Sequence, residues 1–241
     1  MPDTETKQKQ LPTWCWFPRV WYAGDMFDAQ TKSLLGQSGV FAVLTVGKAE
    51  DAPDACKALL DGGVKAIELA LRTPASMQAV ELIARDVPEM LLGIGTVIKK
   101  GQAKAVKELG ADFGVSPGCN PSIIEEAQKA GLPFAPGIAT ASELEQAYEL
   151  GCDTLKLFPA EPLGGISYLK AMSGPYSYLG ISFVPLGGVN LSNLGQWASQ
   201  KNVLAVGGSW IAGTPLVEAH DWKAITKNAK EAMETWNNFR K

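Results

Sequence analysis

An eightfold alternation of two kinds of segment limits the possible folds of this chain most strongly. From about residue 38, short apolar runs, many ending in Gly, Pro or Thr, are followed by stretches rich in Ala, Glu and Lys with helical periodicity. Successive β-then-α units predict a parallel sheet joined by right-handed crossovers. The apolar runs span residues 40–46, 66–71, 91–96, 112–117, 133–138, 154–159, 182–188 and 203–210.

Two arrangements of such a sheet are possible, a closed (β/α)8 barrel (TIM barrel) and an open, doubly wound sheet. The number of units is close to eight, and several runs carry polar residues at alternate positions. Strands of an open sheet are covered on both faces and read as nearly continuous apolar runs, whereas alternate residues of a barrel strand point into its interior. The chain has 241 residues, a length that suits one α/β barrel. We therefore expect an α/β (β/α)8 barrel domain over residues 38–241.

Residues 1–37 do not follow the repeat and are expected to form an N-terminal arm and a leading helix. The helix is predicted over residues 25–36, where it would plug the bottom of the barrel. The arm before it is rich in aromatic residues, which usually pack on the host domain or on a neighbouring subunit rather than form a ligand site. These aromatic residues are Trp14, Trp16, Trp21 and Tyr22.

Two of the predicted helices carry start and stop signals. Asn120 precedes Pro121 and an amphipathic stretch that ends at Gly131. Ser142, with Glu145 three residues later, forms a capping-box pattern before a helix that ends near Gly151.

Composition argues against several classes of function. A net charge of -3 and a pI near 5.3 argue against a nucleic-acid partner. No apolar run reaches the length of about 18 residues that a membrane helix needs, and the N-terminus resembles neither a secretory signal nor a transit peptide. The four cysteines are far apart and only one histidine is present, which argues against a metal site or a disulfide framework. A cytoplasmic location is the simplest interpretation.

The run AIELALRT places ionisable residues on one face of a strand. Side chains alternate along a strand, so Glu68, Ala70 and Arg72 share one face while the apolar residues between them share the other. If the apolar set packs on the helices, Glu68 and Arg72 point into the barrel near the carboxyl end of the strand. The alternative is a buried structural ion pair, which adds little net stability.

A lysine occupies the middle of the run TLKLFP. With Leu155 and Leu157 facing the helices, Lys156 would face the barrel axis. Burial disfavours its charged form, and a neutral amine is the nucleophile that attacks a ketone to form a Schiff base. The alternative is a lysine that extends to solvent at the strand end, which the following Phe158 and Pro159 disfavour.

The last two runs end in glycines that would allow backbone N–H groups to approach an anion. The loops after the seventh and eighth strands are the common phosphate site of barrels. The alternative is a set of tight turns that bind nothing. The glycines are Gly187 and Gly188 after one run, and Gly207 and Gly208, with Ser209, after the next.

Seven motifs, each at the end of a predicted strand, follow one another along the chain. They are GGVKAIELALRT, GIGTV, GVSPG, PGIATASEL, LKLFPAE, PLGGVN and AVGGSW. With these motifs in this order, the chain resembles the 2-keto-3-deoxy-6-phosphogluconate (KDPG) and 4-hydroxy-2-oxoglutarate (KHG) aldolase family from about residue 38 to beyond residue 225. The resemblance implies a class I aldolase that yields pyruvate and glyceraldehyde 3-phosphate, without metal or other cofactor, and assembles as a homotrimer.

The resemblance also implies a role for each matched position. Lys156 matches the Schiff-base lysine and Glu68 the general acid/base. Four residues match a pocket for the substrate carboxylate and pyruvate, namely Arg72, Thr96, Pro117 and Phe158. Five residues match the phosphate-binding site, namely Gly187, Gly188, Gly207, Gly208 and Ser209.

One position departs from the pattern of many 6-phosphogluconate-type members. They carry Thr before the paired glycines, near the C4 hydroxyl of the substrate, whereas this chain has Leu186. An apolar residue there occurs in relatives that act on the galactonate epimer, and losing the hydroxyl partner weakens discrimination at C4. A 2-keto-3-deoxy-6-phosphogalactonate aldolase is therefore an alternative. Two others are a different phosphosugar barrel enzyme, such as an epimerase or synthase, and a non-catalytic binding protein.

Overall fold

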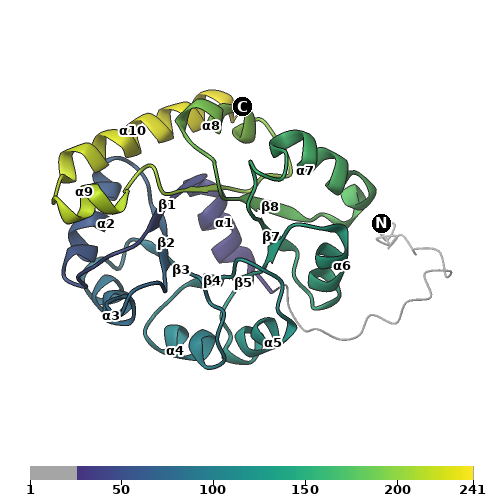
Figure 1. The fold of residues 1–241 in the computed structure, drawn as a ribbon, viewed down its shortest axis with the longest axis horizontal. Coiled ribbons are helices and arrows are strands. Elements are labelled where there is room, and N and C mark those ends of the chain that lie inside the picture. Colours follow the sequence, from purple (N-terminus) through teal and green to yellow (C-terminus); the bar gives the residue numbers. More distant parts are fainter. Residues whose placement is uncertain (1–25, 241) are drawn as a thin grey trace, which may run out of the picture.

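All eight predicted apolar runs contain a strand in the computed structural model, which describes residues 26–240 (Figure 1). The run over residues 133–138 contains two short strands on either side of Pro136. The strands are β1 (Val40–Leu44), β2 (Ala66–Ala70), β3 (Leu91–Gly95), β4 (Phe113–Val115), β5 (Phe134–Ala135), β6 (Gly137–Ile138), β7 (Thr154–Leu157), β8 (Ser182–Pro185) and β9 (Val206–Gly208).

Helices follow the strands and lie outside them (Figure 1). They are α1 (Ala29–Ser38), α2 (Asp51–Asp61), α3 (Ser76–Asp86), α4 (Gln102–Glu108), α5 (Pro121–Ala130), α6 (Ala141–Glu149), α7 (Gly165–Ser173), α8 (Leu191–Ala198), α9 (Thr214–Glu218) and α10 (Trp222–Phe239), with a 3-10 helix, η1, over Gly174–Leu179. The exception is α1, which lies within the ring of strands. Between residues 26 and 240, no helix has both the length and the apolar composition needed to cross a bilayer.

The strands form two parallel sheets. Six strands lie in the order β5-β4-β3-β2-β1-β9, and three in the order β6-β7-β8. Neighbours in space follow the order of the chain, and the last strand returns to pair with the first. A doubly wound sheet reverses its strand order at a switch point, so the open-sheet alternative is wrong.

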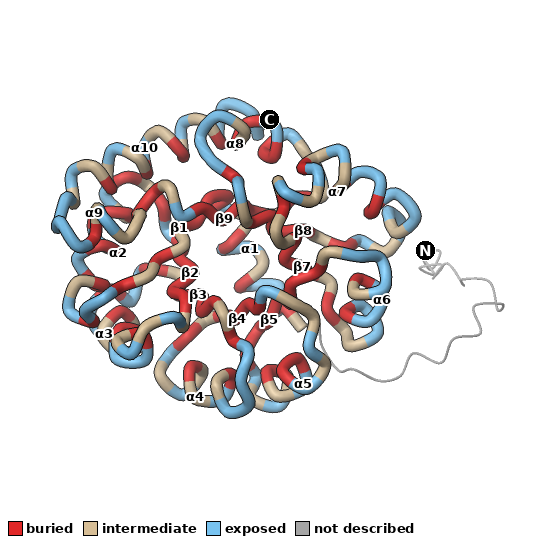
Figure 2. The backbone as a smooth tube through the Cα atoms, in the orientation of Figure 1, coloured by how far each residue is buried: buried red, intermediate tan, exposed pale blue. Residues whose placement is uncertain are grey.

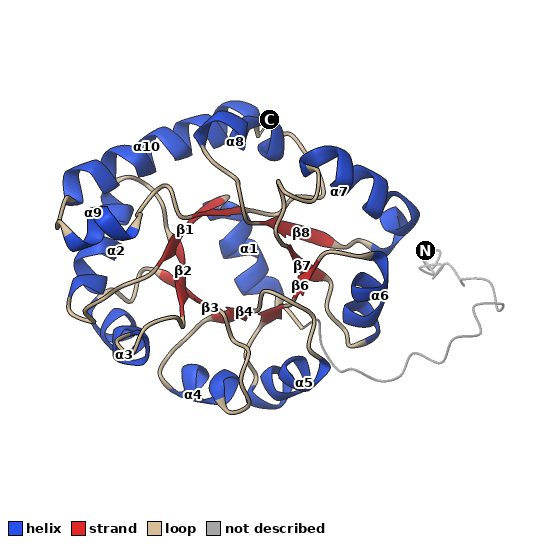
Figure 3. Cartoon of the chain, in the orientation of Figure 1, coloured by secondary structure: helices blue, strands red, loops and turns tan. Residues whose placement is uncertain are grey.

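The two sheets meet at two seams. At one, Pro136 separates β5 from β6, because proline has no N–H to donate to a ladder, while its carbonyl accepts a hydrogen bond of 2.9 Å from the N–H of Lys156. At the other, Phe183 of β8 bridges Val203, shortly before β9, and its carbonyl accepts from the N–H of Leu204 at 2.9 Å. The strands of both sheets consequently surround α1 (Figure 3).

Alternate residues of the strands belong to two separate cores. Ile67 and Leu69 of β2 pack outward with the helices in the larger apolar cluster. Ala66 belongs to a smaller cluster that also contains Phe41, Phe113 and Leu35 of α1. We call the side of the strands that bears this second cluster the inner face. The predicted alternation of β2 is confirmed, and Figure 2 shows the strands buried while the surrounding loops are more exposed.

Helix α1 closes the end of the ring at which the strands begin. Leu35 and Phe27, just before the helix, are buried in the inner cluster, and the ring centroid of Phe27 lies 5.6 Å from that of Phe113. Lys32 forms an ion pair of 2.6 Å with Asp153, which precedes β7. With that end covered, the carboxyl ends of the strands are left as the open end.

The leading helix starts and ends later than the predicted range of 25–36. Asp28 caps it by accepting a hydrogen bond of 2.9 Å from the N–H of Thr31, and this bond lowers the pKa of the Asp28 carboxyl. The helix ends before Gly39, whose φ is 66°. The predicted aromatic arm with Trp14, Trp16, Trp21 and Tyr22 lies outside the described residues.

One of the two predicted helix caps is confirmed. Asn120 caps α5, and Gly131 ends that helix in a left-handed conformation. The cap predicted at Ser142 is wrong, because α6 begins at Ala141 and Thr140 caps it, accepting from the N–H of Glu143 at 3.3 Å. The sequence TASELE contains the same spacing in two overlapping frames, and only the earlier frame is used.

Shortening Leu35 is expected to destabilise the fold because its side chain fills the inner core beneath the strands. Leu35→Ala should lower the free energy of unfolding by about 2–5 kcal/mol, measured by urea denaturation. Leu34 is 44% exposed, so the matched control Leu34→Ala should change it by less than about 0.5 kcal/mol. Equal effects of the two substitutions would contradict the placement of α1 inside the ring.

Candidate active site

A lysine and a glutamate meet on the inner face although 88 positions separate them in the sequence. Lys156 points inward from β7 between the outward-facing Leu155 and Leu157, and Glu68 points inward from the middle of β2. The Nζ of Lys156 lies 3.0 Å from Oε1 and 3.1 Å from Oε2 of Glu68. The side chains are only 4% and 1% exposed, respectively.

Burial makes each of these groups depend on the other. Removing two charges from water is costly, and only good geometry with additional hydrogen bonds compensates. A proton can pass between a lysine and a carboxylate at this distance, which yields a neutral amine beside a carboxylic acid. A ketone attacked by that amine would therefore have a proton donor within reach.

Gly95 creates the space that the carboxylate of Glu68 occupies. Gly95 is paired with Ala70 in the register between β3 and β2. Any side chain at Gly95 would overlap the carboxylate of Glu68. The signal in the sequence is a strand with glycines at alternate positions, 93 and 95, which is typical of a close approach by another group. The motifs and strand periodicity do not by themselves predict a role for Gly95 in the site.

Phe158 lies beside the lysine. The centre of its ring is 5.3 Å from the Nζ of Lys156, within the range of a cation–π contact. The N–H of Phe158 donates to the carbonyl of Ile138 at 3.1 Å, which holds the residue against β6.

Arg72 and Thr96 meet at the open end of the ring. The Nε of Arg72 donates to the Oγ1 of Thr96 at 3.2 Å, and among the described residues no carboxylate pairs with this guanidinium. Thr96 has a φ of 62°, which is strained for a β-branched residue. An exposed guanidinium without an acidic partner can accept the carboxylate of a ligand.

One expectation and one alternative for Arg72 are wrong. It does not continue the inner face of β2, because the strand ends at Ala70 and the N–H of Arg72 turns back to the carbonyl of that residue at 2.8 Å. Nor does Arg72 pair with Glu68, whose partner is Lys156.

Pro117 lies in the loop after β4 and is exposed. Its backbone carbonyl group packs so closely on Gly137 that no side chain would fit there. Gly137 lies opposite Lys156 in the register of β6 and β7. Pro117 therefore contacts the residue that is paired with the lysine.

The glycines predicted to bind phosphate fall into two groups. Gly187 and Gly188 form a turn after β8, with φ values of 90° and 87° that favour glycine. Within residues 26–240, neither of their N–H groups donates a hydrogen bond to another protein group. Unpaired N–H groups in such a turn are donors for an anion.

Gly207 and Gly208 are buried within β9. A side chain at Gly207 would overlap the ring of Phe41, and one at Gly208 would overlap the ring of Trp210. Ser209, which follows them, is exposed.

Leu186 lies between the inner core and the turn of Gly187 and Gly188. It is buried with Val184 in the inner cluster, against which the partly buried Phe158 packs. Its N–H donates to the carbonyl of Leu157 at 3.0 Å. Its side chain approaches Gly207 closely enough to exclude a Cβ there.

Two other groups that could take part in chemistry are less suited to it. Burial, assisted by the nearby Glu143, raises the pKa of the Cys119 thiol to about 11, so it is protonated at neutral pH. His220 pairs with Asp51 at 2.9 Å and stacks on Trp222, away from Lys156.

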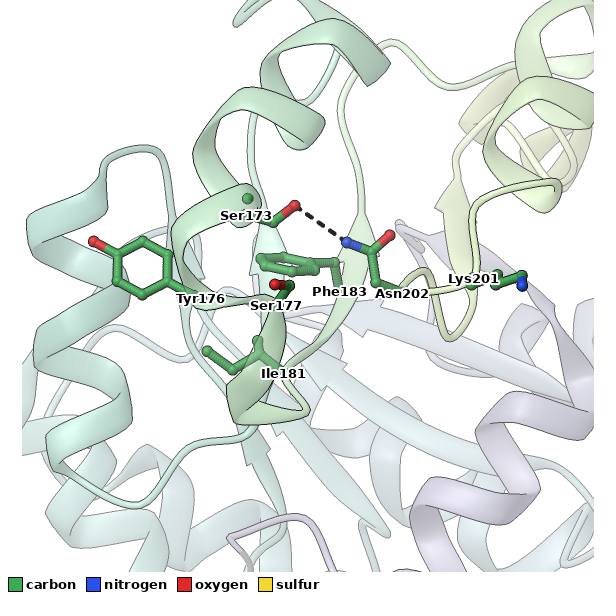
Figure 4. Close-up of a pocket in the computed structure, with 8 residues that line it drawn as sticks. Ser173, Tyr176, Ser177, Ile181, Phe183, Lys201 and Asn202 are labelled. Carbon is green, nitrogen blue, oxygen red and sulfur yellow. Dashed lines mark hydrogen bonds between the residues drawn. The ribbon is translucent and has the colours of Figure 1, made fainter. Parts of the chain in front are cut away.

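A separate cavity of about 250 Å³ lies outside the ring of strands (Figure 4). It is lined by residues of η1 and by side chains near the beginning of β8, including Phe183, Ser177 and Asn202. None of the predicted site residues borders it. It is therefore distinct from the site of Lys156 and Glu68.

Comparisons with known proteins agree on one family. A family model described as KDPG and KHG aldolase matches residues 31–228. The KHG/KDPG aldolase of Escherichia coli (strain K12) is 40% identical over 208 residues, which cover 86% of this chain and 97% of that protein. The 2-dehydro-3-deoxy-phosphogluconate aldolase of Dickeya dadantii (strain 3937) is 39% identical over 207 residues, with 86% and 96% covered.

A solved structure with a similar fold holds a covalent intermediate. It is the KDPG aldolase of Legionella pneumophila with pyruvate captured at low pH as a carbinolamine. The TM-score is 0.80 at 37% sequence identity, and the match covers 84% of this chain and 98% of that one.

A methyl group at Gly95 is expected to separate the lysine from the glutamate, because it would overlap the carboxylate of Glu68. Gly95→Ala should lower the free energy of unfolding by about 1–3 kcal/mol through overpacking, and a crystal structure should show Glu68 displaced from Lys156. The control is Gly118→Ala, because no atom lies within 4 Å of the added methyl. An unchanged contact in Gly95→Ala would refute this role.

Proposed function

The chain belongs to the KDPG and KHG aldolase family, and we propose that it is a class I aldolase that cleaves 2-keto-3-deoxy-6-phosphogluconate to pyruvate and glyceraldehyde 3-phosphate. A second substrate is 4-hydroxy-2-oxoglutarate. The observation that carries this proposal is the buried contact of Lys156 with both carboxylate oxygens of Glu68. The contact supplies a nucleophile and a proton acceptor at one point of the inner face.

The reaction begins with activation of the lysine. Lys156 gives a proton to Glu68, and its lone pair attacks the C2 carbonyl carbon of the substrate, forming a carbinolamine. The hydroxyl of the carbinolamine leaves as water with the proton held by Glu68. The nitrogen lone pair forms the C=N bond, which leaves a protonated imine on Lys156.

Cleavage then uses the imine as an acceptor of electrons. Glu68 takes the proton of the C4 hydroxyl, the C3–C4 bond breaks, and its electron pair moves into the imine to form an enamine while glyceraldehyde 3-phosphate departs. Glu68 returns the proton to C3, and water hydrolyses the resulting imine to release pyruvate and the free amine of Lys156.

The substrate carboxylate is assigned to the rim pocket of Arg72 and Thr96, with Pro117 and Phe158 as its walls. A guanidinium binds a planar carboxylate through two parallel hydrogen bonds. The support is the exposed position of Arg72 and its contact with the strained Thr96.

The substrate phosphate is assigned to the turn of Gly187 and Gly188 and to Ser209. The support is the pair of N–H groups without a protein acceptor and the exposed serine. Gly207 and Gly208 belong to this site as positions that must remain small for Phe41, Leu186 and Trp210 to pack there.

Several broader assignments accompany this function. We assign the two sheets, joined at their seams, to one (β/α)8 barrel domain over residues 38–241. Residues 1–37 are assigned to an arm and a leading helix. The protein is assigned to the cytoplasm and to a homotrimer. A homotrimer gives a mass of three chains in multi-angle light scattering.

Trapping with pyruvate should identify Lys156 as the Schiff-base residue. Borohydride reduces an imine to a stable amine, so pyruvate with borohydride should label Lys156, as read by peptide mass spectrometry. Lys156→Met should abolish the label and lower aldol cleavage by more than about 1000-fold. The control is Lys129→Met, which removes a side chain that is 80% exposed. Unchanged turnover in Lys156→Met would favour a different phosphosugar enzyme, and binding of pyruvate without label or turnover would favour a binding protein.

The position of Leu186 is expected to relax selection at C4, since an apolar side chain offers no partner to a hydroxyl. The wild-type protein should cleave the gluconate and galactonate 6-phosphate epimers at comparable kcat/KM. Leu186→Thr should shift the ratio towards the gluconate epimer by about tenfold. Leu186→Val is the matched control because valine has nearly the shape of threonine without the hydroxyl. Strong discrimination by the wild type, or the same shift in both variants, would contradict this role.

A further inference from the structure

The loop after β7 lies directly against the turn of Gly187 and Gly188. The N–H of Ala160 donates to the carbonyl of Leu186 at 2.7 Å, and the N–H of Glu161 donates to the carbonyl of Gly187 at 3.0 Å. A side chain at Gly188 would come within 2.6 Å of the Cβ of Glu161. Glu161 therefore supports the glycine turn from one side with its backbone and the first carbon of its side chain.

The carboxylate of Glu161 points away from the turn and bonds to helix α8. Its Oε1 accepts a hydrogen bond of 2.7 Å from the indole Nε1 of Trp197. Trp197 is completely buried, and a buried indole N–H requires an acceptor. A charged acceptor makes such a bond stronger than one between neutral groups.

Helix α8 supports the same turn from the other side. The side-chain amides of Asn190, which caps α8, and of Asn193, in the first turn of that helix, donate to the carbonyl of Gly188 at 3.0 and 3.1 Å. The bond between Glu161 and Trp197 thus connects the two supports of the turn, and hydrogen bonds form a closed circuit around Gly187 and Gly188.

This circuit matters because the turn consists of two glycines. Glycine loses more conformational freedom on ordering than any other residue, and an anion that has to order its own site binds more weakly. A turn that is already fixed presents its two unpaired N–H groups at no further ordering cost. Glycines have no side chains that could hold the turn in place, so neighbouring residues must fix its conformation.

We propose that Glu161 is a positioning residue for the substrate phosphate, which holds the turn of Gly187 and Gly188 in its anion-binding conformation through its bond to Trp197. The proposal rests on the proposed function and deepens it. Glu161 touches neither the reacting carbons nor the phosphate. Its effect should therefore depend on whether the substrate carries a phosphate.

The test compares a phosphorylated with an unphosphorylated substrate. The ratio of kcat/KM for 2-keto-3-deoxy-6-phosphogluconate to that for 4-hydroxy-2-oxoglutarate should fall about tenfold in Glu161→Ala, mainly through KM for the phosphorylated substrate. Glu161→Gln should keep most of the ratio, because its amide oxygen still accepts from the indole. Trp197→Phe should lower the ratio in the same direction as Glu161→Ala.

The matched control is Glu145→Ala. Glu145 is also a glutamate that accepts one hydrogen bond from an aromatic side chain, the hydroxyl of Tyr176 at 2.6 Å, but it lies on α6. The ratio should stay at its wild-type value in this variant. Equal losses for both substrates in Glu161→Ala, or a loss in Glu161→Gln as large as in Glu161→Ala, would overturn the proposal.

Inorganic phosphate gives a second measurement that does not depend on the phosphorylated substrate. It should inhibit cleavage of 4-hydroxy-2-oxoglutarate, with an inhibition constant about tenfold higher in Glu161→Ala than in the wild type. An unchanged constant would count against the proposal. Borohydride trapping of pyruvate on Lys156 in each variant tests the aldolase function separately from the role of Glu161. Failure of trapping in the wild type would overturn the aldolase function itself.

Discussion

Two opposite charges that face each other inside the ring of strands set the requirements for their surroundings. Lys156 and Glu68 are almost fully buried, and either one alone would be an uncompensated charge costing about 3–5 kcal/mol. Gly95 provides the space for the carboxylate, and Phe158 lies over the ammonium. Helix α1 covers one end of the ring, and Arg72 and Thr96 meet at the other end.

The strands and the inward directions of Lys156 and Glu68 were predictable because both follow from one periodicity. Side chains alternate along a strand, so the outward Leu155 and Leu157 fix the inward direction of Lys156, just as Ile67 and Leu69 fix that of Glu68. The same rule failed for Arg72, because periodicity does not reveal where a strand ends. Likewise, the repeated spacing in TASELE did not reveal which of Thr140 and Ser142 caps α6.

Contacts between distant segments could not be predicted from local patterns. The sequence alone does not determine whether Glu68 pairs with Arg72 or with Lys156, and the three-dimensional structure pairs it with the lysine. The hydrogen bond from Trp197 to Glu161 joins a helix to a loop 36 positions away in the sequence. No sequence periodicity at either residue predicts this bond. Such contacts depend on how whole elements pack together, here α8 and the loop after β7, rather than on the residues adjacent in the sequence.

The division of the strands into two sheets has a mechanical consequence. Glu68 belongs to the six-stranded sheet and Lys156 to the three-stranded one, and the seams at Pro136 and Val203 carry fewer ladder bonds than the sheets themselves. Lys156 and Glu68 thus meet across the interior between the two sheets, at 3.0 Å, rather than within one ladder. The contact between them therefore ties the two sheets together from inside, in addition to the hydrogen bonds at the seams.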